Sequence, residues 1–170
     1  PEGVWARRGL VVGHVQSGQP GSYIGLICKA ADAGYKIVVV LAGTHNNLRS
    51  QTQIRLDEGF LGFATNPNPD VVEFVGAGKD GRDAHIKPNC ATNRSETGDF
   101  NRKVAKHLAI SPEQRPWLFV VKKNKTVLKL LLEWIRNHVA NAVDPETNRK
   151  TVTHLPLLMI DDEADHASVD

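Results

Sequence analysis

Apolar residues alternate along the chain between short continuous runs and stripes with helical spacing. The continuous runs are typical of strands in a parallel sheet that is covered on both faces. They lie at residues 9–13, 36–42, 117–121 and 155–160. Helical spacing is found at residues 21–33, from Asn46 or Asn47 to about Glu58, and at 126–142. The order of these segments predicts an α/β domain with three layers and a mostly parallel sheet.

Residues that favour a helix end are found at two places in the sequence. Gly34 is well placed to end the first helix, and Asn46 or Asn47 could cap the start of the second. The third helix carries one continuous apolar stripe that we assign to the core. Its members are Leu128, Leu131, Leu132, Ile135 and Val139.

Residues 62–100 differ from the rest because they are rich in Gly, Pro, Asn and charged residues. Only residues 71–75 have a strand-like composition there, so we expect a loop-rich excursion from the sheet. The remaining pattern predicts one domain over residues 1–170. The absence of an initial Met and the stop shortly after the last motif lead us to expect that this domain is part of a longer protein.

Composition excludes several classes of protein. The formal net charge is only +2, but residues 160–170 contain five acids and no Lys or Arg, so the acidic charge is concentrated at one end. The longest apolar runs have about six residues, whereas a membrane-spanning helix needs roughly 20. Cys28 and Cys90 are far apart and do not have the spacing of a zinc site or a disulfide framework. We therefore expect a cytoplasmic protein without a membrane span.

A glycine-containing turn follows the first predicted strand and leads into the first helix. Gly13 and Gly18 have the spacing of a phosphate-binding loop, in which backbone N–H groups surround the phosphates. The candidate nucleotide-binding residues are Gly13, His14, Val15, Gln16, Ser17, Gly18, Gln19 and Pro20. The alternative is an ordinary tight turn between a strand and a helix.

The last apolar run leads directly into a cluster of acids. Nucleotide hydrolysis with Mg²⁺ requires one carboxylate for the hydrated metal and another that polarises the attacking water. Asp162 is the candidate metal ligand and Glu163 the candidate base, while Asp161 offers a competing register. His166 could couple hydrolysis to movement or could cap the loop. The alternative for the whole cluster is a solvated acidic loop.

A third polar group follows the second predicted strand. Thr44, Asn46, Arg49 and Gln53 could contact a nucleic-acid backbone through neutral donors and one guanidinium. Helix capping with an exposed polar face explains the same residues. The short basic run at residues 122–125 could neutralise phosphates or form a solvated turn.

Four blocks of the chain together resemble the Z-one domain family of bacterial putative endonucleases. The blocks read GHVQSG, YIGLICKAADAGYKIVVVLAGTHNNLRSQTQIRLDEGFLG, LFVVKKNKTVLKLLLEWI and LLMIDDEADHASV. Because that family is similar to superfamily-two helicases, the resemblance implies a RecA-like P-loop domain that binds ATP and Mg²⁺. It implies that Gly13 and Gly18 belong to the phosphate loop, and that Asp162, Glu163 and Asp165 belong to the DEAD segment. Asp165 and His166 are the candidate coupling residues.

The resemblance also implies a function in DNA restriction or phage defence. The expected partners are DNA and a second RecA-like domain or a nuclease domain outside this chain. Gln19 and Pro20 replace the Lys and Thr of the family pattern, so we expect weak ATP binding and impaired turnover. One alternative is a non-catalytic scaffold that binds DNA or a partner. The other is a Mg²⁺-dependent endonuclease that uses the acidic cluster directly, with the residues Asp161, Asp162, Glu163, Asp165 and His166.

Overall fold

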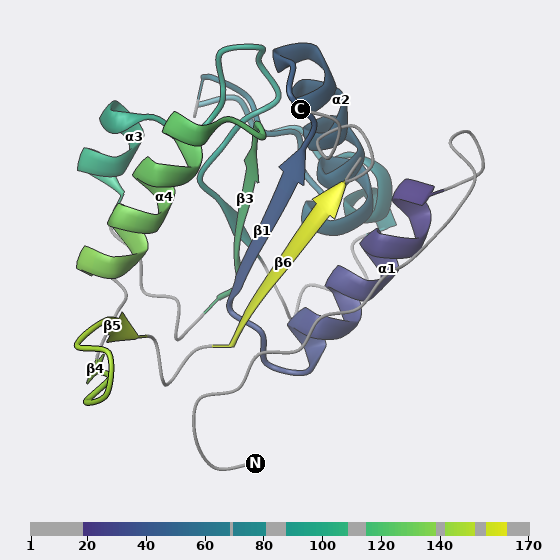
Figure 1. Ribbon diagram of the computed structural model, residues 1–170. Helices are drawn as coiled ribbons and strands as arrows, with labels where there is room; N and C mark the ends of the chain where they lie inside the picture. Colours follow the sequence, from purple (N-terminus) through teal and green to yellow (C-terminus); the bar gives the residue numbers. More distant parts are fainter. Residues whose placement is uncertain are drawn as a thin grey trace.

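The computed structural model of the protein contains a parallel β-sheet (Figure 1). The structure describes residues 19–68, 70–80, 88–108, 115–138, 142–151 and 156–162. Within these residues the sheet has four strands in the order β2-β3-β1-β6, and every pairing is parallel. The strands are β1 (Ile37–Ala42), β2 (Asn89–Cys90), β3 (Trp117–Val121) and β6 (Leu157–Asp162). A separate antiparallel pair is formed by β4 (Ala142–Val143) and β5 (Lys150–Thr151).

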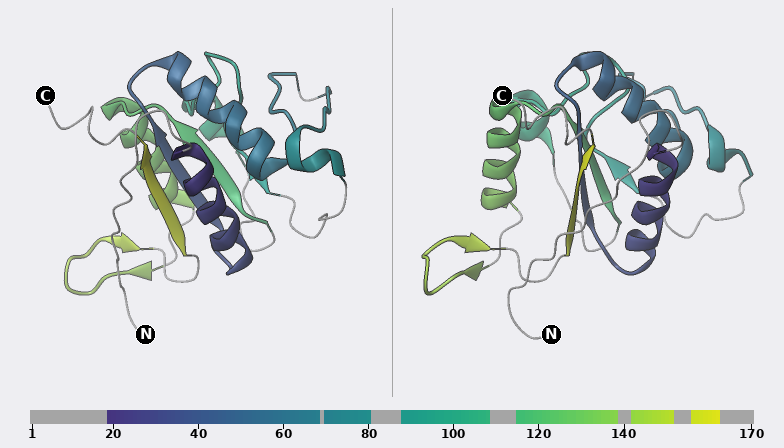
Figure 2. Two further views of the ribbon diagram at one scale, coloured as in Figure 1. Left: turned by 90° about the vertical axis from the view of Figure 1, so that its right-hand side faces the viewer. Right: turned by 45° about the vertical axis from the view of Figure 1, so that its right-hand side comes forward.

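Helices cover both faces of the sheet, as Figure 2 shows. One face carries α1 (Gln19–Asp32) and α2 (Asn46–Leu56), and the other carries α3 (Arg102–His107) and α4 (Lys125–His138). The alternation of side chains along β1 explains the two cores. Val38 and Val40 face α1 and α2, whereas Val39 faces α4. The predicted three-layer α/β architecture is confirmed.

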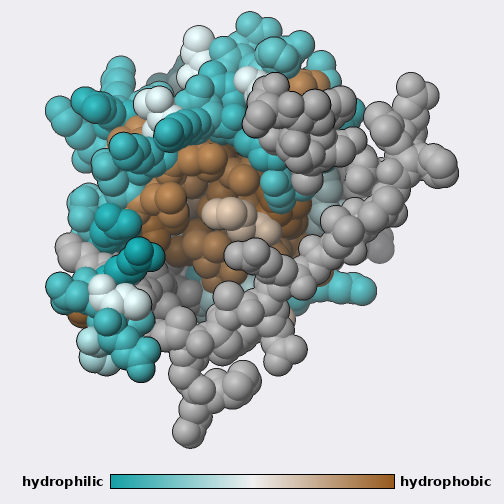
Figure 3. Space-filling model, viewed as in Figure 1, coloured by the Kyte–Doolittle hydropathy of each residue, from teal (hydrophilic) through white to brown (hydrophobic). Residues whose placement is uncertain are grey.

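Burial differs between the central strands and β6. All six residues of β1 are buried, which agrees with its continuously apolar sequence. Among the described residues β6 has a paired neighbour on one side only. Exposure alternates along it because Leu158 and Ile160 pack against the core on the α1 side, whereas Leu157 is 38% and Met159 48% exposed. Leu157 and Met159 lie on the α4 side of the sheet, where Figure 3 shows an apolar area next to polar residues.

The predicted helices are confirmed with small shifts at their ends. Helix α1 ends as expected: Gly34 has a φ of 100° and the Tyr35 amide donates to the Ala30 carbonyl at 2.9 Å. Helix α2 begins at Asn46 and its N-cap residue is His45, whose side chain makes no capping hydrogen bond, so the predicted Asn N-cap is wrong. The Asn47 side chain accepts instead from the Leu48 amide, inside the first turn, at 2.9 Å. The helix continues as a π-helical turn, η1 (Asp57–Leu61). Helix α4 spans Lys125–His138, and its predicted end at residue 142 is wrong because Ala142 begins β4. The short helix α3 was not predicted.

The segment at 62–100 is mostly irregular, but two predictions about it are wrong. Residues 71–75 form no strand; Phe74 makes one isolated bridge with Phe63 and is 63% exposed. A strand requires a continuous backbone partner, and this segment has none in the described part of the chain. In addition, the excursion returns to the sheet, because β2 pairs with β3 after the short 3₁₀ helix η2 (Gly76–Asp80).

Candidate functional site

Several of the described candidate residues lie near the carboxyl ends of the parallel strands. In the sheet register Ala42, the last residue of β1, lies beside Asp162, the last residue of β6. Helix α1 begins at Gln19 near the same edge, which lies at the top of Figure 1. Ligands in open parallel sheets bind beyond the carboxyl ends of the strands, so a ligand site is expected at this edge.

One hydrogen bond joins the first part of α1 to the end of β6. The Tyr23 hydroxyl donates to Asp162 Oδ2 at 3.2 Å, across 139 positions of the sequence. Burial, followed by the charge of Asp162, raises the pKa of the Tyr23 hydroxyl well above its usual value. The hydroxyl therefore stays protonated and acts as a donor. Gln19 and Pro20 are the first two residues of the same helix.

Asp161 is held differently from its neighbour. Because side chains alternate along a strand, Asp161 faces the α4 side of the sheet while Asp162 faces the α1 side. The Lys123 ammonium pairs with Asp161 Oδ1 at 2.5 Å. The Lys123 amide also donates to the Gly43 carbonyl at 2.6 Å, which fixes this residue across the end of β1. The two registers that the sequence left open are thus physically distinct.

The adjacent lysine contacts the beginning of α2. Lys122 Nζ donates to Asn46 Oδ1 at 3.0 Å, and the Lys122 amide donates to Asp99 Oδ2 at 3.2 Å. Burial raises the pKa of the Asp99 carboxyl, while hydrogen bonds from the amides of Phe100 and Lys122 act to lower it. Thr44 and Asn46 are both exposed. A polar surface made of the exposed Thr44 and Asn46 and the half-buried Lys122 therefore lies at the carboxyl edge.

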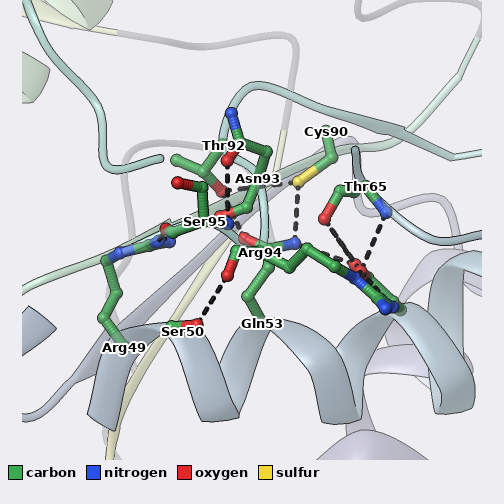
Figure 4. A network of polar contacts seen from close by, with 10 residues as sticks. Arg49, Ser50, Gln53, Thr65, Cys90, Thr92, Asn93, Arg94 and Ser95 are labelled. Atoms are coloured by element: carbon green, nitrogen blue, oxygen red, sulfur yellow. Dashed lines mark hydrogen bonds and ion pairs between the residues drawn. The ribbon is translucent and has the colours of Figure 1, made fainter. Parts of the chain in front are cut away.

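Arg49 and Gln53 are not part of that surface, because both are fully buried. Arg49 donates to the carbonyls of Val120, Asn93 and Ser95, at 3.3, 2.9 and 2.5 Å. Figure 4 shows its guanidinium directed at these segments. Burial lowers the pKa of the Arg49 guanidinium, and nearby Asp99 opposes this. The side chain therefore anchors the loop after β2, and direct contact with nucleic acid would require that loop to open.

Gln53 belongs to a buried polar network that spans three segments (Figure 4). Its amide nitrogen donates to Asp57 Oδ1 at 3.0 Å, and the Thr92 hydroxyl donates to its amide oxygen at 2.7 Å. Asp57 also pairs with Arg94 at 3.0 Å and accepts from the Thr65 amide at 2.9 Å. A buried carboxylate is stable only with such partners, so the network holds α2 against the excursion.

Cys90 contributes its sulfur to this network rather than to a reactive site. Gln53 Nε2 donates to its sulfur at 3.4 Å. Burial raises the pKa of the Cys90 thiol, so at neutral pH it is a thiol and not a thiolate nucleophile. Sequence reasoning missed the network, although Arg49, Gln53 and Asp57 are spaced four residues apart and share a helix face. That spacing was the available signal.

Many of the candidate residues lie outside the part of the chain that the structure describes. This applies to the predicted strand 9–13, to the turn from Gly13 to Gly18, and to Glu163, Asp165 and His166. Among the residues that are described, no group of three or more His, Cys, Asp or Glu could hold a metal ion. Asp162 is the described acid of the candidate site that faces α1.

Comparison of the chain with protein-family models, with curated proteins and with solved structures finds no match. The fold observed here is α/β, with a parallel sheet between layers of helices. None of the helices in the described ranges is both long and apolar enough to cross a membrane.

Proposed function

We propose that this chain is the first RecA-like ATPase domain of a helicase-like, DNA-directed protein from a bacterial restriction or phage-defence system. The observation that carries the proposal is the hydrogen bond between Tyr23 and Asp162, which brings the start of α1 to the end of β6. A triphosphate site of this kind requires those two elements at one edge of the sheet. The resemblance to the Z-one domain family points to the same pair of motifs.

The donor set at this edge suits a magnesium nucleotide. Mg²⁺ keeps several waters and is bound through one or two carboxylates together with substrate phosphates, so it does not need a cage of three protein acids. Asp162 would supply that carboxylate. The first turn of α1, a helix of 14 residues, would attract the phosphates through its N-terminal partial charge. When bound, Mg²⁺ would neutralise phosphate charge and orient the nucleotide.

The roles of the remaining residues follow from the sequence motifs. We assign nucleotide contacts to the turn from Gly13 to Gly18, the polarisation of water to Glu163, and coupling to Asp165 and His166. Gln19 and Pro20 bring neither an ammonium nor a hydroxyl, and proline also lacks a backbone N–H. The proposed nucleotide binding is therefore weak, and turnover is impaired.

DNA is the proposed partner at the neighbouring surface made of Thr44, Asn46 and Lys122. These side chains lie beside the start of α2, where neutral donors and one ammonium match the oxygens of a phosphate backbone. Arg49 would support this surface from inside by holding the loop after β2. A second RecA-like domain or a nuclease domain outside this chain would complete the protein.

The test is a titration of the purified chain with a fluorescent ATP analogue, with Mg²⁺ and with EDTA. We expect weak binding that depends on Mg²⁺, and we expect Asp162→Asn to remove the Mg²⁺-dependent part. The double variant Gln19→Lys, Pro20→Thr restores the missing groups and should strengthen binding by at least about tenfold, which corresponds to about 1.4 kcal/mol. Asn137→Lys, on the exposed end of α4, adds the same charge elsewhere and should have no effect.

If the double variant gains no affinity over Asn137→Lys, the assignment of the phosphate loop is wrong. The non-catalytic scaffold is then the better candidate, and it is favoured by Gln19 and Pro20 in the first turn of α1. It predicts DNA or partner binding without any thermal shift on addition of Mg-ATP. The Mg²⁺-dependent endonuclease is less well supported, because Asp161 and Asp162 face opposite sides of the sheet.

A further inference from the structure

Two adjacent carboxylates end β6, and each has a different partner from a different element. Asp162 accepts from the Tyr23 hydroxyl of α1 at 3.2 Å. Asp161 pairs with the Lys123 ammonium, which comes from the loop between β3 and α4. The side chain of Lys123 is 14% exposed and that of Asp161 is 43% exposed, so this ion pair lies at the rim of the sheet.

We propose that Tyr23 and Lys123 are positioning residues that assign different roles to these two acids, so that Asp162 alone serves the metal of the nucleotide site. This inference rests on the proposed function. Lys123 neutralises Asp161 on the α4 side, and Tyr23 orients Asp162 on the α1 side. Tertiary partners therefore set the register of the metal ligand, which the sequence had left open between Asp162 and Asp161.

The difference between the two partners is chemical. An ammonium cancels the charge of the carboxylate that it contacts, and a cation gains little from a carboxylate that is already paired. A phenol is neutral, so it leaves the full negative charge on Asp162. It occupies one oxygen with a hydrogen bond and leaves the other for a ligand. This is the arrangement by which outer residues orient a metal-binding carboxylate.

Lys123 is itself held in place by its backbone. Its amide donates to the Gly43 carbonyl at 2.6 Å, directly after β1, which lies between β3 and β6 in the sheet. The side chain therefore extends across the end of β1 to reach β6. A lysine in an ordinary solvated turn would lack this backbone contact.

The first part of the test measures the two pairings without any metal. Double-mutant cycles with Tyr23→Phe, Lys123→Met, Asp161→Asn and Asp162→Asn report coupling between side chains through urea unfolding of the whole chain. We expect the Tyr23–Asp162 and Lys123–Asp161 pairs to change the folding equilibrium constant by about three- to fivefold beyond additivity. In the crossed pairs, Tyr23–Asp161 and Lys123–Asp162, the effects on the folding equilibrium constant should be additive within about twofold.

The second part measures binding of Mn²⁺, as a stand-in for Mg²⁺, in the presence of a non-hydrolysable ATP analogue, by the relaxation of water protons. Asp162→Asn should weaken Mn²⁺ binding by at least about tenfold, and Tyr23→Phe by about threefold, because the carboxylate loses its orientation. Asp161→Asn should change it by less than about threefold. Lys123→Met should strengthen binding about twofold by releasing Asp161, and adding Asp161→Asn should reverse that gain.

Matched controls are available for both partners. Tyr35→Phe removes a hydroxyl from the other tyrosine, and Lys125→Met removes the charge of an exposed lysine two positions away. Both should leave Mn²⁺ binding unchanged. The inference would be overturned, even if Mn²⁺ binds, by equal losses of Mn²⁺ binding in Asp161→Asn and Asp162→Asn. It would also be overturned if the Tyr23–Asp162 and Lys123–Asp161 cycles showed no coupling beyond additivity. Intact couplings without any Mn²⁺ binding would instead overturn the proposed function, and with it the role assigned to the pairs.

Discussion

Replacement of Arg49 distinguishes a structural anchor from a contact with nucleic acid. In Arg49→Met the side chain keeps most of its volume but loses all of its donors. The carbonyls of Val120, Asn93 and Ser95 then lose their hydrogen-bond partner in the interior. Hydrogen bonds from a charged group contribute about 1.5–3 kcal/mol each, so the gross loss is several kcal/mol.

Part of that loss is offset. The guanidinium is fully buried and, among the described residues, makes no salt bridge, so its removal relieves an electrostatic cost. Burial also lowers the pKa of the Arg49 guanidinium, because the charged form loses its hydration in the interior. We therefore expect the free energy of unfolding to fall by about 3 kcal/mol, a large part of the 5–15 kcal/mol typical of a domain.

The assay is urea unfolding followed by circular dichroism, with the midpoint and slope compared between variants. Arg49→Lys should be nearly as destabilised, because one ammonium cannot reach carbonyls of two separate segments as a planar guanidinium does. Arg55→Met, on the exposed side of the same helix, should change stability by less than about 0.5 kcal/mol. Unchanged stability of Arg49→Met together with lost DNA binding would refute the anchor and restore Arg49 as a surface contact.

Two other predictions concern the backbone and the pH dependence of stability. A Cβ on Gly78 would lie 1.8 Å from the Gly62 carbonyl oxygen, so Gly78→Ala should cost at least about 2 kcal/mol in thermal or urea unfolding. Gly25→Ala, in α1 with nothing within 4 Å, should instead stabilise by about 0.5–1 kcal/mol. Burial raises the pKa of Asp99 above 3.8, so its contribution to stability is present below that pH and is lost as pH rises through the folded-state pKa. The unfolding free energy of Asp99→Asn relative to the unmodified chain should therefore increase between about pH 4 and pH 7, and an unchanged difference would contradict this sign.

Much of the sheet could be predicted from local composition. The predicted strand at residues 36–42 is observed as Ile37–Ala42, which is apolar at every position because β1 is covered on both faces. Residues 117–121 form β3 with the predicted bounds. The apolar stripe of α4 predicted the helix, but its assignment to the core is only partly confirmed. Leu131 is buried and Leu128 and Ile135 pack against the core, whereas Leu132 is 54% exposed and Trp134, outside the predicted stripe, is buried.

The errors occurred where local composition and long-range pairing disagree. Residues 71–75 have the composition of a strand, yet they lack a partner over their length and leave Val72 72% exposed. Conversely, Asn89 and Cys90 look like loop residues but pair with β3. Pairing between segments depends on where the chain brings them, and apolar composition does not report this.

The candidate site shows the same division. The sequence identified Asp161 and Asp162 at the end of an apolar run, and the strand β6 confirms that position. It favoured Asp162 but could not show how the two acids differ, because their surroundings come from Tyr23 and Lys123, which are distant in the chain. Likewise Arg49 looked like part of an exposed polar patch, whereas its partners lie on β3 and in the loop after β2.

The sequence by itself determined the α/β class, the main helices and buried strands among the described residues, and the segments that could carry chemistry. These depend on periodicity and on residue type, which are local properties. Only the tertiary structure decided which polar side chains are buried and which carboxylate faces α1. Burial and pairing are set by segments that are distant in sequence, so their energies cannot be assigned until the strands are placed side by side.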